Sequence, residues 1–187
     1  KINPTLGQFL DKTMVPWLYE DMEKRGYEMA PYVHSMGRTP ESGIQDYLET
    51  PRYSTGYSTL YNALGFVTET HMWKPYKERV LSTYEFLASM LTFANDNHTQ
   101  VKAFRNKAKL FTASQKRFDL NWELDTTMKQ EFAFKGYESK TKTSKVTGLE
   151  RMYYDRNEPY TRYISYFNTY KATLKIKAPK YYIVPQG

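Results

Sequence analysis

The hydrophobic pattern of the first half of the chain is typical of helices. Residues 5–26 carry apolar side chains at spacings of three and four, which predicts an amphipathic helix. Pro16 interrupts this segment, so we expect a kink or two helical pieces, with Thr13 capping the second. Residues 74–95 form the clearest helical pattern. Its apolar stripe consists of Val80, Tyr84, Leu87 and Leu91.

Between these two helices the sequence predicts a loop, a short helix and a strand. Residues 27–33 read as extended, and residues 35–57 are rich in turn formers and predict irregular structure. Residues 57–64 predict a short helix that ends at Gly65. Phe66-Val-Thr68 then predicts a buried strand, and Glu69 follows it directly.

After residue 97 the period of the hydrophobic pattern changes to two. Residues 117–124 and 170–177 alternate strictly between apolar and polar side chains, as half-buried strands do. Further predicted strands are 130–137, 149–154, 162–167 and 181–184. We expect them to form a small antiparallel sandwich or partial barrel.

The charge distribution divides the chain at the same place. Residues 1–97 hold 9 Lys and Arg against 12 Asp and Glu, and residues 98–187 hold 18 against 8. We therefore expect two domains: an α/β domain over 1–97 and an antiparallel β-rich domain over 98–187, α+β overall.

Composition narrows the possible functions. The 187 residues contain no cysteine, so thiolate chemistry and disulfides are excluded. Lys and Arg in the second half mostly alternate with apolar residues, which favours the wet face of a sheet over a nucleic-acid surface. No membrane span or signal pattern is visible. Because the sequence starts at Lys1 without a methionine, we expect a piece of a longer protein.

Glu69 is the principal candidate for chemistry. A carboxylate at the carboxyl end of a strand lies where ligands bind in open α/β sheets, and there it can serve as a general base. The alternative is an ordinary strand-end carboxylate that pairs with a base such as Arg79. His71 lies two residues further on and is either a group that orients its neighbours or a packed histidine.

The order of these elements and the stretch Pro51–Pro75 resemble a known enzyme family. Pro51-Arg-Tyr-Ser54, Glu69-Thr-His-Met72 and Lys74-Pro75 are similar to segments of bacterial zinc metallocarboxypeptidases of the carboxypeptidase A family. The resemblance covers about residues 1–97 and implies the C-terminal portion of the catalytic domain, followed by a β-rich accessory domain.

The resemblance implies hydrolysis of the C-terminal peptide bond of a peptide substrate by a zinc-activated water. Glu69 then takes the proton of the water as general base. The family also uses a loop tyrosine that closes on the substrate. Tyr47, Tyr53 and Tyr57 are the candidates for it, and the resemblance favours Tyr53. Arg52 beside it can meet a substrate carboxylate, and His71 is a candidate outer-shell group near the metal.

The sequence departs from the family at the metal. The family holds zinc through His-x-x-Glu and a later His, and this motif does not occur here; the only histidines are His34, His71 and His98. We therefore expect no zinc ligand in this chain and no activity of the chain alone. The ligands then lie in a missing N-terminal half.

Two further expectations concern partners and location. Without the half of the sheet that flanks residues 66–68, a strand edge and an apolar face are exposed, which predicts self-association or binding of the missing half. By analogy with the family, the protein is periplasmic or extracellular. The alternative function is that of a non-catalytic carboxypeptidase-like protein that recognises peptide or glycan, for which the cluster of tyrosines after residue 150 offers a surface.

Overall fold

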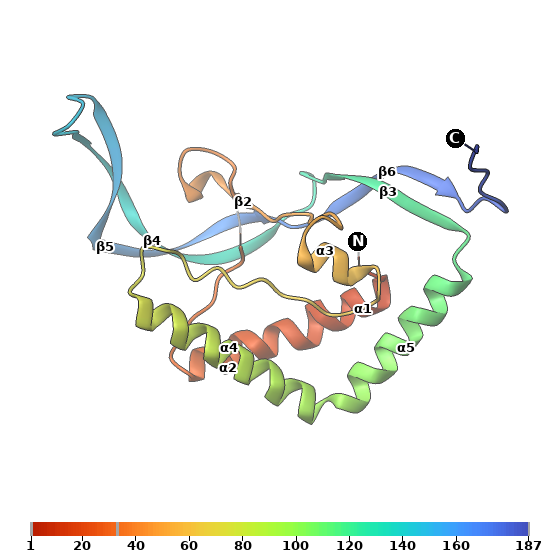
Figure 1. Ribbon diagram of the computed structural model, residues 1–187. Coiled ribbons are helices and arrows are strands. Elements are labelled where there is room, and N and C mark those ends of the chain that lie inside the picture. Colours follow the sequence, from red (N-terminus) through yellow and green to blue (C-terminus); the bar gives the residue numbers. More distant parts are fainter. Residues whose placement is uncertain (1, 33, 187) are drawn as a thin grey trace. The chain divides into compact units, whose positions relative to one another are not determined.

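The computed structural model describes residues 2–32 and 34–186 and shows a mixed α+β protein with several helices and two sheets (Figure 1). The chain forms two compact units from discontinuous segments. The first consists of Lys1–Met29, Leu48–Leu120 and Lys175–Gly187, and the second of Ala30–Tyr47 and Asn121–Leu174. Residue 97, where the charge balance changes, lies inside the first unit.

The first unit is mainly helical. Its helices are α1 (Pro4–Phe9), the π-helical turn η1 (Leu10–Met14), α2 (Val15–Lys24), α3 (Ser54–Thr59), α4 (Tyr76–Asp96) and α5 (His98–Ser114). No helix in the described part of the chain is both long enough and apolar enough to cross a membrane.

The predicted N-terminal helix exists, but its interruption differs from the prediction. Asn3 begins α1 by accepting the backbone N–H of Thr5 through its side chain at 3.0 Å. The chain then passes through η1 into α2 without a break, and Thr13 does not cap a second piece. The wider π turn accommodates Pro16, which has no N–H to donate to an α-helical carbonyl.

The core of the first unit joins the N-terminal helices to α4 and α5. Phe9 stacks on Phe104 of α5 with ring centroids 4.6 Å apart, and Trp17 packs against Phe93 of α4 at 5.2 Å. The buried core residues are Leu6, Phe9, Met14, Leu18, Met22, Phe86, Phe93 and Ala108.

Helix α4 confirms the helix predicted over 74–95. It buries Phe86, Ser89 and Phe93 against the core. The stripe that includes Tyr84 and Leu91 lies on the opposite side and stays exposed to solvent.

Helix α5 was not predicted, and the expectation of a β-rich segment from residue 98 is wrong for residues 98–114. Its inner face is readable in the sequence, because Val101, Phe104 and Ala108 follow one another at spacings of three and four. The basic residues between them hide this helical pattern.

The four-stranded sheet is mixed rather than wholly antiparallel. Its strands are β1 (His34–Ser35), β2 (Ile44–Gln45), β5 (Glu150–Phe167) and β4 (Gln130–Thr143), in that spatial order, with the 3₁₀ turn η2 (Pro40–Ser42) between β1 and β2. Strand β2 runs parallel to β5, and the other pairs are antiparallel.

Strands β4 and β5 form one long hairpin. The predicted strands 149–154 and 162–167 are joined into β5, in which Asp155 and residues 159–161 also pair with β4 while residues 156–158 have no partner on it. The register therefore shifts between Tyr137 and Glu138, where three residues of β5 are inserted relative to β4.

The second sheet is an antiparallel pair of β3 (Arg117–Leu124) and β6 (Tyr170–Lys177), as the alternation predicted. Residues 181–184 are not a strand.

Candidate functional site

The segment that carries Glu69 has no regular structure. Residues 63–71 are neither helix nor strand, so the strand predicted over 66–68 is wrong. Leu64 and Phe66 still pack against the helical core, where the Phe66 ring meets the edge of Phe86 at 5.9 Å. The apolar residues therefore anchor the segment, but within the described residues no strand pairs with it.

The Glu69 side chain is exposed, and within the described residues it makes no hydrogen bond or ion pair. The pairing with Arg79 that the sequence allowed is not formed. Instead, the Arg79 guanidinium lies over the Tyr76 ring, 5.6 Å from its centroid. The carboxylate is therefore open to a ligand or a water molecule from solvent.

His71 shapes the turn that leads into α4. It adopts a left-handed backbone conformation with φ of 34°. Its Nδ1 accepts the backbone N–H of Trp73 at 3.2 Å, and its carbonyl accepts the N–H of Lys74 at 3.1 Å. Because Nδ1 accepts, the neutral ring carries its proton on Nε2, on an exposed side chain. Sequence reasoning missed this turn-forming role, since φ > 0 at a histidine leaves no clear sequence signal.

Arg52 and Tyr53 lie in the turn that begins α3. The Tyr53 N–H donates to the carbonyl of Thr50 at 2.9 Å, and the Tyr53 carbonyl accepts from Tyr57 at 2.7 Å as the helix starts. Both side chains are exposed. Gly56 allows this close packing, because a Cβ at that position would lie 2.1 Å from the Thr50 carbonyl oxygen.

The structure does not join the four predicted site residues directly. Among the described residues, no hydrogen bond or ion pair connects Arg52 or Tyr53 with Glu69 or His71. All four belong to the first unit, on or next to the irregular segments on either side of α3. What they share is exposure to solvent.

The described residues do not fit a zinc site. No group of three or more His, Asp or Glu side chains in residues 2–32 and 34–186 is placed to hold a metal ion. The three histidines lie on different elements: His34 in β1, His71 in the turn before α4, and His98 at the start of α5. His98 Nδ1 also lies 2.8 Å from the carbonyl oxygen of Asn95, within hydrogen-bonding distance.

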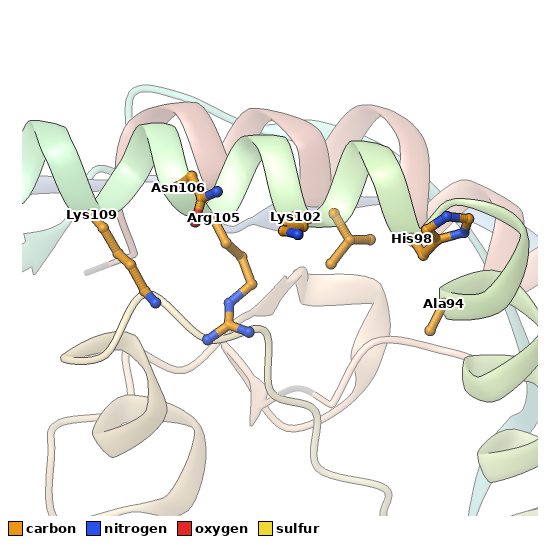
Figure 2. A pocket seen from close by; sticks show the side chains of 7 residues that line it. Ala94, His98, Lys102, Arg105, Asn106 and Lys109 are labelled. Carbon is orange, nitrogen blue, oxygen red and sulfur yellow. The ribbon is translucent and has the colours of Figure 1, made fainter.

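A basic hollow of about 340 Å³ lies along α5, and sequence reasoning did not find it. Figure 2 shows Arg105 and Lys109 extending from the same side of this helix. The Arg105 Nε donates to the carbonyl of Asn62 at 3.1 Å, which holds the guanidinium in place. The hollow is lined by Ala94, His98, Val101, Lys102, Arg105, Asn106 and Lys109.

If residues 97–118 are taken as a helix, the sequence predicts the basic side of α5 that lines this hollow. Positions 98, 102, 105 and 109 lie on one side of a helix, and residues 97–118 contain six Lys and Arg and no Asp or Glu. The expectation that such residues line the wet face of a sheet is wrong for this segment.

Comparisons with known proteins gave no match to a family model, a curated protein or a solved structure. The resemblance of Pro51–Pro75 to zinc carboxypeptidases therefore remains a prediction from the residues themselves.

Proposed function

We propose that Glu69 is the general base of a peptide-hydrolysing site, of the zinc metallocarboxypeptidase kind that the Pro51–Pro75 stretch resembles. The observation that carries the proposal is the state of the Glu69 carboxylate: it is exposed, and within the described residues nothing binds it. A general base must be free to accept a proton from a water molecule.

The local structure supports this role. On one side of Glu69, Phe66 is anchored in the core, and on the other side the His71 turn leads into α4. Glu69 is thus held between two fixed points, although its own segment is irregular. Its carboxylate Oε atoms would accept a proton from water and pass it to the nitrogen of the leaving amine.

Arg52 and Tyr53 are proposed to contact the peptide substrate. Both are exposed on a turn fixed by Gly56 and Thr50, and the planar guanidinium of Arg52 suits the terminal carboxylate of a peptide. In the free chain they are not bound to Glu69, so substrate would have to bridge them. His71 is proposed to position this loop through its turn.

The described residues offer no group of side chains that could hold zinc, so the zinc ligands would have to lie on polypeptide outside them. The consequence for this chain is that residues 1–187 alone should not hydrolyse peptides.

The test compares Glu69→Gln with the unchanged full-length natural protein in an assay for release of C-terminal residues. Glutamine keeps the shape but cannot accept a proton, so kcat should fall on the order of 10²–10⁴-fold with little change in KM. Glu78→Gln, an exposed carboxylate in the first turn of α4, is the matched control and should leave kcat unchanged. Full activity of Glu69→Gln would remove Glu69 from the mechanism.

One observation in the second unit favours the alternative, a binding protein for peptide or glycan. Tyr32 and Tyr47 stack with ring centroids 5.2 Å apart and remain 50% and 38% exposed. An exposed pair of rings offers a flat surface for the apolar face of a sugar.

This alternative is tested by titrating residues 1–187 with a panel of neutral oligosaccharides and following tyrosine fluorescence. Binding that Tyr47→Ala abolishes, and that Tyr137→Ala leaves intact, would support it; Tyr137 is a 42% exposed tyrosine of β4 in the same unit. No saturable change with any sugar would count against glycan recognition.

A further inference from the structure

Helix α4 is apolar on two opposite faces, and in the part of the chain that the structure describes only one of them is packed against other elements. Phe86 and Phe93 are buried in the core of the first unit. On the other side of the helix, Tyr84 is 64% exposed and Leu91 is 71% exposed. A helix that is apolar on both faces is typical of an element buried on both sides.

The exposed apolar side runs from the turn before the helix to Leu91. We call it the α4 stripe; it consists of Trp73, Tyr76, Val80, Tyr84, Leu87 and Leu91. From their exposures and typical side-chain areas, these residues present on the order of 800 Å² of surface. This equals about one partner's share of a standard protein interface, and it exceeds the apolar patches common on monomers.

The spacing within the α4 stripe fits pairing with another helix. Val80, Tyr84, Leu87 and Leu91 follow one another at spacings of four, three and four, which is the a/d repeat of a two-helix seam. In such seams the flanking positions choose the partner through their charges. Here the positions that flank the centre, Leu81, Thr83, Ala88 and Met90, are all uncharged.

We propose that the α4 stripe binds the α4 stripe of a second copy of this chain, so that two α4 helices pack side by side. The centre of the stripe is self-complementary, since its uncharged flanks neither repel an identical helix nor select a different one. Its area is also sufficient for a dimer without any other surface. The proposal is independent of Glu69, which lies outside the stripe.

The proposed dimer uses α4, which is not the surface at which the sequence predicted self-association. The sequence placed it at a strand edge over residues 66–68, which form no strand. Helix α4 instead supplies a regular, exposed apolar face within a single unit.

The test is sedimentation velocity of residues 1–187 over about a hundredfold range of concentration. We expect a concentration-dependent dimer. Leu87→Glu and Leu91→Glu should each raise the dimer dissociation constant by about tenfold to a hundredfold, because each buries a charge in the seam. Leu110→Glu is the matched control: it is a 74% exposed leucine on α5, outside the stripe, and should leave the constant unchanged.

Complementation makes the test specific. Leu87→Glu and Leu87→Lys should each weaken the dimer, because each homodimer holds two like charges in its seam. An equimolar mixture should dimerise more tightly than either variant alone, because its heterodimer holds one charge of each sign. A monomer at every concentration, or an equal effect of Leu110→Glu, would overturn the proposal. Circular dichroism of each variant checks folding; loss of the fold in Leu87→Glu would place Leu87 inside the protomer and would overturn it as well.

Discussion

Arg25 at the end of α2 donates from Nη1 to the Glu85 carboxylate of α4 at 2.8 Å, across 60 residues of sequence. Its Nε also donates to Asp21 at 2.6 Å. The three side chains are about three-quarters shielded from solvent, so this network links two helices at the border of the core.

We expect Arg25→Met to weaken the first unit. Without the guanidinium, two partly shielded carboxylates lose their common donor, and the urea midpoint should fall by roughly 0.4 M. Lys24→Met is the control, because the ion pair of Lys24 with Glu20 lies within one helical turn and both side chains are mostly exposed. Equal midpoints for the two variants would show that the network contributes nothing.

The same network predicts that the stability of the first unit falls at acidic pH. The hydroxyl of Ser89, and then Arg25, hold the pKa of Asp21 below its ordinary value. A carboxyl with a lowered pKa in the folded state stabilises the fold at neutral pH, and the gain is lost as pH falls through that pKa, below about 4. Unfolding followed from pH 7 to pH 3 should therefore show a smaller loss in Asp21→Asn than in the unchanged chain.

Gly56 predicts a second effect on stability, close to Arg52 and Tyr53. A methyl group at this position meets the Thr50 backbone at 2.1 Å, so Gly56→Ala must displace the turn and should cost about 2 kcal/mol. Gly7→Ala is the matched change in α1, where the nearest atom is a flexible Ile2 methyl at 3.1 Å. Alanine there should be neutral or stabilising by up to about 1 kcal/mol. Thermal unfolding of both variants distinguishes the two sites.

We expect substitution of His71 to loosen the turn before α4 without destabilising the whole first unit. Valine at a φ of 34° is strained and lacks an acceptor for the Trp73 N–H, whereas asparagine tolerates the conformation and offers one. Amide hydrogen exchange at Trp73 and Lys74 should become faster in His71→Val and stay close to normal in His71→Asn. Equal exchange rates in both variants would show that the His71 side chain does not stabilise the turn.

The sequence predicted those elements whose signals are local. Helix α4 was found within two residues of its ends, because an uninterrupted apolar period and Pro75 at the start mark it. The π turn could not be predicted. It inserts an extra residue between Phe9 and Met14, so that Met14 rather than Thr13 enters the core, and only tertiary packing makes that choice.

Strands were predictable only where the partner is close in sequence or the alternation is strict. Residues 66–68 have the composition of a strand, but no neighbouring strand in the described chain supplies hydrogen bonds. Conversely, Asp155–Pro159 has the composition of a loop, yet both its ends pair with β4 and only residues 156–158 between them are unpaired, so β5 continues across the segment. For the candidate site, the exposure of Glu69 followed from no sequence signal, and the basic hollow on α5 required the helix to be known first.

The environment of Tyr160 in β5 predicts that the stability of the fold depends on pH in the alkaline range. Burial, and then the neighbouring Glu41 carboxylate, raise the pKa of Tyr160 to about 12, from an ordinary value of 10.0. The folded state thus keeps the phenol proton that the unfolded chain releases. The stabilisation is complete below pH 10 and is lost as the pH rises toward 12.

Tyr160→Phe should remove this contribution, because phenylalanine has no proton to lose. Its loss of stability between pH 9 and pH 11 should be shallower than that of the unchanged chain, measured by urea unfolding at each pH. Tyr163→Phe, at a 75% exposed position on the same strand, should follow the unchanged chain. Parallel pH profiles for Tyr160→Phe and the unchanged chain would contradict the raised pKa of Tyr160.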